Sequence, residues 1–120
     1  MTRVFVYGTL RAGQPNHRLL RGATAFGAAT TAEPFVMHDL GAFPAIVAGG
    51  ATPIAGEVYE VDADTLRALD RLEGYPGFYD RVEVGLTDGT RALVYTMQPR
   101  QVAERPIIPT GDWLRRIHRG

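Results

Sequence analysis

Residues 66–76 read LRALDRLEGYP, and this segment says most about the fold and the function of the chain. Its leucines recur at helical spacing, which predicts an amphipathic helix. At about 100° per residue, Glu73 falls between Leu66 and Leu69 on the apolar face of that helix. A glycine and a proline follow, and they end the helix. The segment therefore predicts a helix whose last turn carries a carboxylate toward the core.

A carboxylate in that position is costly unless something uses or satisfies it. Burial disfavours its charged form and the negative end of the helix dipole opposes ionisation further, so both raise its pKa. A glutamate tuned in this way can act as a general base near neutral pH. The structural alternative is that Glu73 caps backbone amides of the first loop, or pairs with Arg11 or Arg81. Those arginines could instead be solvated, or pair with Asp80 or Glu83.

The overall composition bounds the class of protein. The 120 residues predict a single domain, residues 1–120, with the apolar and charged fractions of an ordinary globular protein. The formal net charge is zero, and no basic block is present, so neither a nucleic acid nor a membrane surface is an expected partner. The apolar stretch at the N-terminus is too short for a signal peptide, which makes the cytoplasm the expected compartment.

Three residue types are missing from the sequence: serine, cysteine and lysine. Their absence excludes serine triads, cysteine nucleophiles, disulfides, cysteine zinc sites and lysine Schiff bases. The three histidines, His17, His38 and His118, are scattered with no two at ligand spacing, so no metal site is expected. The available chemistry is that of carboxylates, tyrosine, histidine, threonine and backbone amides.

Short β-branched and aromatic runs outnumber helical patterns along the chain. The expected strands are residues 4–7, 25–31, 35–38, 45–48, 54–61, 78–86 and 90–97, with a hairpin turn at Asp88-Gly89. The expected helices are residues 17–21, capped by Asn16, a helix after residues 62–64 that carries Glu73, and residues 113–118. Residues 99–109 read as a loop. This pattern predicts an α+β domain built around a curled sheet or small barrel.

A second segment that carries chemistry follows the first strand. Residues Tyr7, Gly8, Thr9 and Leu10 lie where that strand, expected to be central, gives way to a glycine loop. Such a loop can aim successive backbone N–H groups at an anion or a carbonyl oxygen. Taken alone, a tyrosine and glycine after a strand also fit a plain turn.

Together, the two segments resemble a known family. The runs VFVYGTLR at 4–11 and LDRLEGYPGFYDR at 69–81 are similar to the signature of the γ-glutamylcyclotransferase-like family, and GEVY at 56–59 and GDWL at 111–114 support it. The pieces are spread over nearly the whole chain, in the family's order. The short γ-glutamylamine cyclotransferase type, with its many uncharacterised bacterial members, is the subgroup that the chain resembles.

The resemblance implies a fold, a reaction and a set of site residues. The implied fold is a small mixed β-barrel or curled sheet with a few flanking helices. The implied reaction turns a γ-glutamyl amide into 5-oxoproline and a free amine or amino acid, with no metal or cofactor. By the same resemblance, Glu73 is the catalytic acid and base, and the substrate-binding residues are Tyr7, Gly8, Thr9, Leu10 and Tyr79.

This reaction suits the residues that the chain contains. The α-amino group of the substrate is the nucleophile, so the protein needs no serine, cysteine or lysine. Glu73 would take a proton from that group and return one to the departing amine. The alternative is a domain of the same fold that binds a small ligand without turnover, since function belongs to the site rather than the fold. Residues 41–53 and the loop 99–109 are candidates to shape the leaving-group side of the pocket, but nothing in either segment identifies the amine. The oligomeric state does not follow from the sequence either.

Overall fold

The computed structural model describes residues 1–116 and shows an α+β fold with one α-helix. Its elements, in chain order, are β1 (Thr2–Val6), the 3-10 helix η1 (His17–Leu20), β2 (Thr24–Thr30), β3 (Phe35–Asp39), β4 (Pro44–Ala48), β5 (Ala55–Val61), α1 (Ala63–Glu73), β6 (Asp80–Gly85), β7 (Arg91–Thr96), and the 3-10 helices η2 (Pro99–Val102) and η3 (Trp113–Arg115). All seven strands coincide, within a few residues, with the runs expected from the sequence.

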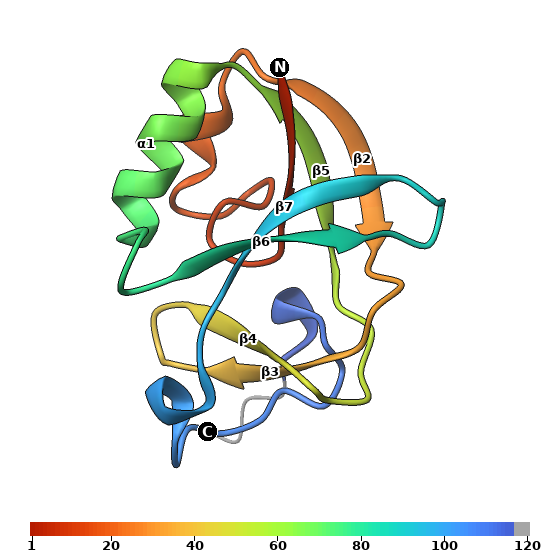
Figure 1. The fold of residues 1–120 in the computed structure, drawn as a ribbon, viewed down its shortest axis with the longest axis vertical. Coiled ribbons are helices and arrows are strands. Elements are labelled where there is room, and N and C mark those ends of the chain that lie inside the picture. Colours follow the sequence, from red (N-terminus) through yellow and green to blue (C-terminus); the bar gives the residue numbers. More distant parts are fainter. Residues whose placement is uncertain (117–120) are drawn as a thin grey trace.

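Strand β1 lies at the centre of a five-stranded sheet, as its apolar sequence predicts. The strand order is β2-β5-β1-β7-β6 (Figure 1). Strand β1 runs antiparallel to β5 and parallel to β7. Its side chains alternate between the two faces of the sheet. Val4 and Val6 therefore join one apolar cluster with Leu69, whereas Phe5 and Tyr7 join a second cluster on the other face.

The sheet curls until its two outer strands meet at one end. Thr31 and Leu86, which follow β2 and β6, form an isolated antiparallel bridge. Beside it, the backbone N–H of Ala32 donates to the carbonyl of Gly85 over 2.9 Å. The contact is confined to this end, and the two strands share no ladder. The curled sheet predicted from the sequence is confirmed, and the barrel is not closed.

The hairpin of β3 and β4 forms a separate two-stranded sheet below the main one (Figure 1). It is joined to β7 where the backbone N–H of Met97 donates to the carbonyl of Ile46 over 3.0 Å. Ile46 and Met37 are fully buried, and η3 adds Trp113 to the same apolar cluster. This packing fixes the β3–β4 turn beside the end of β1.

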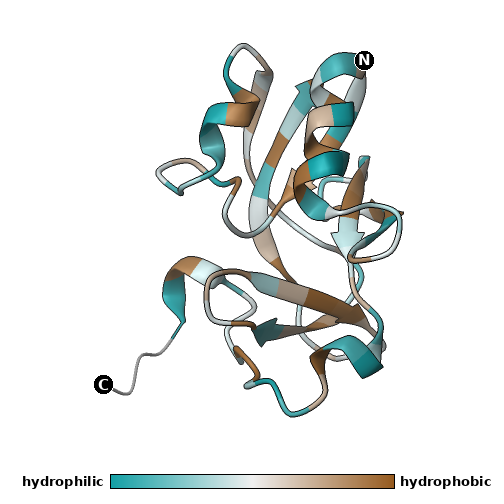
Figure 2. Ribbon diagram, turned by 90° about the vertical axis from the view of Figure 1, so that its left-hand side faces the viewer, coloured by the Kyte–Doolittle hydropathy of each residue, from teal (hydrophilic) through white to brown (hydrophobic). Residues whose placement is uncertain are grey.

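Helix α1 has the caps and the buried face that its sequence predicts. The side chain of Asp62 accepts the backbone N–H of Thr65 over 2.7 Å, which caps the N-terminus. Gly74 ends the helix in the left-handed conformation, with φ of 66°. Leu69 is fully buried, and Figure 2 shows hydrophobic and hydrophilic residues along the same helix, as a half-buried helix requires. Within residues 1–116, no helix combines the length and apolar character needed to cross a membrane.

Several details of the helices differ from the sequence-based expectations. The helix expected at residues 17–21 is a single 3-10 turn, and the side chain of Asn16 does not cap it but donates to the Thr9 hydroxyl over 3.0 Å. The expected loop at 99–109 begins with the 3-10 helix η2. The last helix spans three residues, Trp113–Arg115, rather than 113–118, and His118 lies outside the described residues. Short apolar patterns of four to six residues do not distinguish an α-helix from a 3-10 turn.

Leu69 should be a main stabilising residue of α1 because its side chain is fully buried. We expect Leu69→Ala to lower the free energy of unfolding by about 2–5 kcal/mol, since it removes apolar contacts and leaves a cavity. Leu72→Ala, one turn away at a side chain that is 40% exposed, is the matched control and should cost under about 1 kcal/mol. Urea denaturation of the two variants checks this, and equal losses would contradict the assigned packing.

Candidate active site

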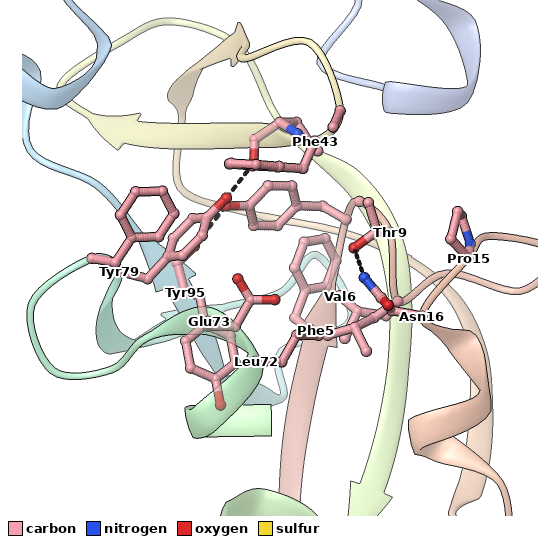
Figure 3. A pocket seen from close by; sticks show the side chains of 16 residues that line it. Phe5, Val6, Thr9, Pro15, Asn16, Phe43, Leu72, Glu73, Tyr79 and Tyr95 are labelled. Carbon is pink, nitrogen blue, oxygen red and sulfur yellow. Dashed lines mark hydrogen bonds between the residues drawn. The ribbon is translucent and has the colours of Figure 1, made fainter. Parts of the chain in front are cut away.

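A cavity of about 400 Å³ lies between the end of β1, the β3–β4 turn and the end of α1. Figure 3 shows its lining side chains. The elements that meet here are far apart in the sequence and are brought together by the curl of the sheet. The lining residues are Phe5, Val6, Tyr7, Gly8, Thr9, Leu10, Pro15, Asn16, Ala42, Phe43, Pro44, Leu72, Glu73, Phe78, Tyr79 and Tyr95.

All six residues predicted from the sequence as catalytic or substrate-binding line this one cavity. They are Tyr7, Gly8, Thr9, Leu10, Glu73 and Tyr79. Their placement meets the geometric requirement that one small molecule should be able to touch both the first loop and Glu73. The chemical role of each residue stays a prediction.

Glu73 occupies the last turn of α1, and its carboxylate points into the cavity (Figure 3). Burial raises the pKa of Glu73 from its usual 4.5 to about 7. Within residues 1–116, the Glu73 side chain has no hydrogen bond and no ion pair, so the structural alternatives for it are wrong. It caps no amide of the first loop, and Arg11 and Arg81 pair elsewhere. The Glu73 carboxylate therefore faces the cavity without a partner in the described part of the chain.

Arg81 pairs with Asp70 rather than with Glu73, Asp80 or Glu83. A guanidinium nitrogen of Arg81 donates to one carboxylate oxygen of Asp70 over 2.6 Å. The hydroxyl of Tyr95 donates to the other Asp70 oxygen over 2.7 Å. This pairing engages the only arginine of β6 with a carboxylate one turn before Glu73. Arg81 therefore forms no ion pair with Glu73, and burial alone accounts for the raised pKa of Glu73.

The loop after β1 comes unusually close to the β3–β4 turn. A Cβ atom at Gly8 would lie 2.7 Å from the ring of Pro44, so only glycine fits there. The backbone N–H groups of Gly8, Thr9 and Leu10 have no acceptor among residues 1–116. Three successive amides at the wall of a cavity can bind a carboxylate or a carbonyl oxygen. The sequence predicts a loop here whose backbone amides bind an anion or a carbonyl oxygen. The unpaired amides are compatible with that role, which stays a prediction.

Arg11 fixes this loop through ion pairs with two carboxylates outside the cavity. Its guanidinium donates to Glu57 on β5 over 3.0 Å and to Asp112 over 2.9 Å. Glu57 also accepts the backbone N–H of Ala12 over 2.9 Å and the hydroxyl of Tyr59 over 2.8 Å. Only 10% of the Arg11 side chain is exposed, so these partners replace its water. The expectation that Arg11 is solvated or pairs with Asp80 or Glu83 is wrong.

Three tyrosines form the inner wall of the cavity. Tyr79 donates its hydroxyl proton to the carbonyl of Pro44 over 2.7 Å, and Tyr7 donates to the carbonyl of Tyr95 over 2.7 Å. Burial, with the nearby Glu73 carboxylate, raises the pKa of Tyr79, and burial is also the main cause of the raised pKa of Tyr7. Both hydroxyls stay protonated at neutral pH. Tyr79 thus joins the β3–β4 turn to the cavity wall.

Sequence reasoning missed the aromatic outer part of the cavity. Phe43 lies in the β3–β4 turn and Phe78 in the connection from α1 to β6. Isolated aromatic residues in loops carry no periodic signal, so nothing in the pattern marked them. The segment 41–53 was expected to shape the leaving-group side, and its residues Ala42 to Pro44 line the cavity. The segment 99–109, of which the same was expected, contributes no lining residue.

The part of the chain that the structure describes holds no group of three or more histidine, aspartate or glutamate side chains arranged to bind a metal ion.

Comparison with known proteins identifies the family. The chain matches the family described as gamma-glutamyl cyclotransferase, AIG2-like, over residues 4–115. A relative from Vibrio cholerae is 40% identical over 114 residues, covering 95% of this chain and 96% of the relative. The gamma-glutamylaminecyclotransferase of Bos taurus is 41% identical over 107 residues, covering 78% of this chain and 64% of that protein. An AIG2-like protein from Mus musculus has a similar crystal structure, with a TM-score of 0.79 and 32% identity over 89% of this chain and 85% of its own. This chain belongs to the gamma-glutamyl cyclotransferase, AIG2-like family.

The raised pKa of Glu73 should be visible in folding stability. The folded state holds the proton up to about pH 7 and the unfolded state only to about 4.5, so stability falls as the pH rises between these values. Glu73→Gln removes this loss. We expect the free energy of unfolding of Glu73→Gln, relative to that of wild type, to rise by about 3 kcal/mol between pH 4 and pH 8, as measured by urea denaturation. Glu83→Gln, at an exposed side chain of β6, is the control, and a pH-independent advantage for Glu73→Gln would contradict the burial of the carboxylate.

The Arg11 ion pairs should stabilise the fold far more than an exposed pair does. We expect Arg11→Ala to lower the free energy of unfolding by about 3–5 kcal/mol, because Glu57 and Asp112 are left partly buried without their cation. Arg91→Ala is the matched control. Arg91 pairs with Glu83 at side chains that are 56% and 58% exposed, and its loss should cost no more than about 1 kcal/mol. Similar denaturation midpoints for the two variants would rule out a structural role for Arg11.

Proposed function

We propose that this protein is a γ-glutamyl cyclotransferase that converts a γ-glutamyl amide into 5-oxoproline and a free amine. The observation that carries the proposal is the placement of Glu73, whose carboxylate points into the cavity (Figure 3) that the loop Gly8 to Leu10, with its unpaired amides, also lines. A carboxylate with a pKa of about 7, facing a cradle for oxygen atoms, is the pair of groups that this reaction needs.

The reaction is a ring closure within the substrate. The α-amino nitrogen attacks the γ-carbonyl carbon and forms the new C–N bond of the five-membered ring. The bond from that carbon to the leaving nitrogen then breaks. The α-ammonium nitrogen gives up one proton before it attacks and a second one after the new C–N bond has formed, so that one N–H remains in the lactam. Glu73 takes these protons in turn and delivers them to the leaving amine, which is released as an ammonium ion. Atoms and charge balance without water and without an enzyme nucleophile, which agrees with the absence of serine, cysteine and lysine.

The loop after β1 would hold the γ-glutamyl group for this attack. Its free amides can bind the α-carboxylate or the γ-carbonyl oxygen, and the second contact would stabilise the oxyanion that forms in the transition state. Binding both ends of a flexible chain also favours its folded conformer, in which the amine already lies beside the carbonyl. The Arg11 ion pairs and the close contact between Gly8 and Pro44 keep this loop rigid.

A pKa near 7 suits a group that must both accept and donate a proton. At neutral pH, Glu73 is present as carboxylate and carboxylic acid in comparable amounts. An exposed glutamate would be too weak a base, and a more strongly buried one would stay protonated. The bovine relative is named for cyclisation of γ-glutamylamines, which supports an amine rather than an amino acid as the leaving group.

The direct test is the release of 5-oxoproline from a panel of γ-glutamyl amines and γ-glutamyl amino acids, followed by mass spectrometry. We expect wild-type turnover, with kcat/KM falling about tenfold per pH unit below pH 7 as Glu73 becomes protonated. Glu73→Gln, which keeps the shape of the side chain but cannot accept the proton, should lower kcat by at least about a hundredfold.

Glu83→Gln, outside the cavity, is the control and should retain the wild-type rate and pH profile. Binding of these amides by wild type without any 5-oxoproline would contradict the proposal and favour a non-catalytic binding domain. Full activity in Glu73→Gln would contradict the role of Glu73.

A further inference from the structure

The cavity contains a single carboxylate and no cation. Of its sixteen lining residues, Glu73 is the only one whose side chain is charged at neutral pH. The side chains of Thr9 and Asn16 lie on one side of Glu73, whereas Tyr79 lies on the opposite side (Figure 3). Apart from Glu73, the lining side chains carry no charge. The free backbone amides belong to the loop after β1, on one side of the cavity.

The outer wall of the cavity is apolar although it is exposed to water. Phe78 is 52% exposed and Leu72 is 40% exposed, and both line the cavity. Phe43 packs edge-on against Phe78, with ring centroids 6.0 Å apart and the planes at 70°. Phe78 in turn meets Tyr79 at 87° with centroids 5.4 Å apart. Exposed apolar side chains gathered at the mouth of a cavity mark a binding surface.

The aromatic wall is held in place before any ligand binds. The backbone N–H of Phe78 donates to the carbonyl of Gly74 over 3.0 Å, and the carbonyl of Phe78 accepts the side-chain amide of Gln101 over 2.6 Å. A Cβ atom at Gly74 would lie 2.8 Å from the Cβ of Phe78, so this turn tolerates no larger residue. Because the backbone of Phe78 is already fixed, binding of an apolar group should cost little free energy for ordering this segment.

We propose that Phe43, Phe78 and Leu72 form the leaving-group subsite and select an amine whose carbon chain is apolar and carries no charge at its far end. This proposal rests on the proposed cyclotransferase function. An alkyl or aryl group leaves water for an apolar wall, which is favourable. An ammonium or carboxylate at the far end of the leaving group would lose water there without gaining a partner of opposite charge among Phe43, Phe78 and Leu72. In the reaction the bond from the γ-glutamyl carbonyl carbon to the nitrogen of this amine breaks, and the amine takes up the proton held by Glu73.

Three γ-glutamyl amides that differ only at the far end of the leaving group test this selectivity. They are the amides of n-hexylamine, of cadaverine, which ends in an ammonium group, and of 5-aminopentanoate, which ends in a carboxylate. We expect kcat/KM for 5-oxoproline release to be at least about tenfold higher for the hexylamide than for either charged amide. Equal values, or a preference for cadaverine, would overturn the proposal, the latter because it would show the ring faces binding a cation.

A charge-introducing variant tests the assignment of the subsite to this wall. Phe78→Glu should favour the cadaverine amide and lower the ratio of hexylamide to cadaverine kcat/KM by at least about tenfold. Val82→Glu is the matched control, because Val82 is 43% exposed on β6 and does not line the cavity. It should leave the ratio unchanged. An unchanged ratio in folded Phe78→Glu, checked by circular dichroism, would place the leaving group elsewhere.

Calorimetric titration of wild type with the same three amides separates this proposal from the proposed function. If no amide yields 5-oxoproline but the hexylamide binds at least about tenfold more tightly than the charged amides, the cyclotransferase proposal fails and the apolar subsite stands. If 5-oxoproline forms from all three at equal kcat/KM, the enzyme assignment stands and the subsite proposal fails. Absence of both turnover and binding would overturn both.

Discussion

The Glu73 carboxylate is desolvated, and the elements around the cavity are arranged about this one unfavourable interaction. The chain carries this group into a cavity on the last turn of α1 and provides no cation or hydrogen-bond donor for it among residues 1–116. Its charged form is therefore destabilised, and the folded state is less stable at neutral pH than it would be with a neutral side chain. A carboxylate whose charged form is destabilised at a cavity is typical of functional sites.

The surrounding arginines do not offset the cost of burying the Glu73 carboxylate. Arg81 is engaged by Asp70, and Arg11 by Glu57 and Asp112. The ion pairs of Arg11 also connect the loop after β1 to β5 and to the segment before η3. The central strand thus supplies the loop, the curled sheet brings α1 and the β3–β4 turn to it, and ion pairs outside the cavity make the arrangement rigid.

Much of this was predictable from the sequence, and the reasons are local. Leu66, Leu69 and Glu73 follow the helical period, and strand β1 follows the β pattern, so the fold class and both walls of the cavity could be inferred. The partners of Arg11 could not, because Glu57 and Asp112 are 46 and 101 residues away along the chain and no periodicity connects them. The aromatic wall was hidden for the same reason, since Phe43 and Phe78 meet only when two loops pack together.

The ionisation of Glu73 can be measured directly. The side-chain carboxyl carbon of Glu73 can be followed by carbon-13 NMR across pH 4 to 9, with its signal assigned by its loss in Glu73→Gln. We expect a midpoint at about pH 7, well separated from that of exposed glutamates. A midpoint at about 4.5, the value of an ordinary solvated glutamate, would contradict it.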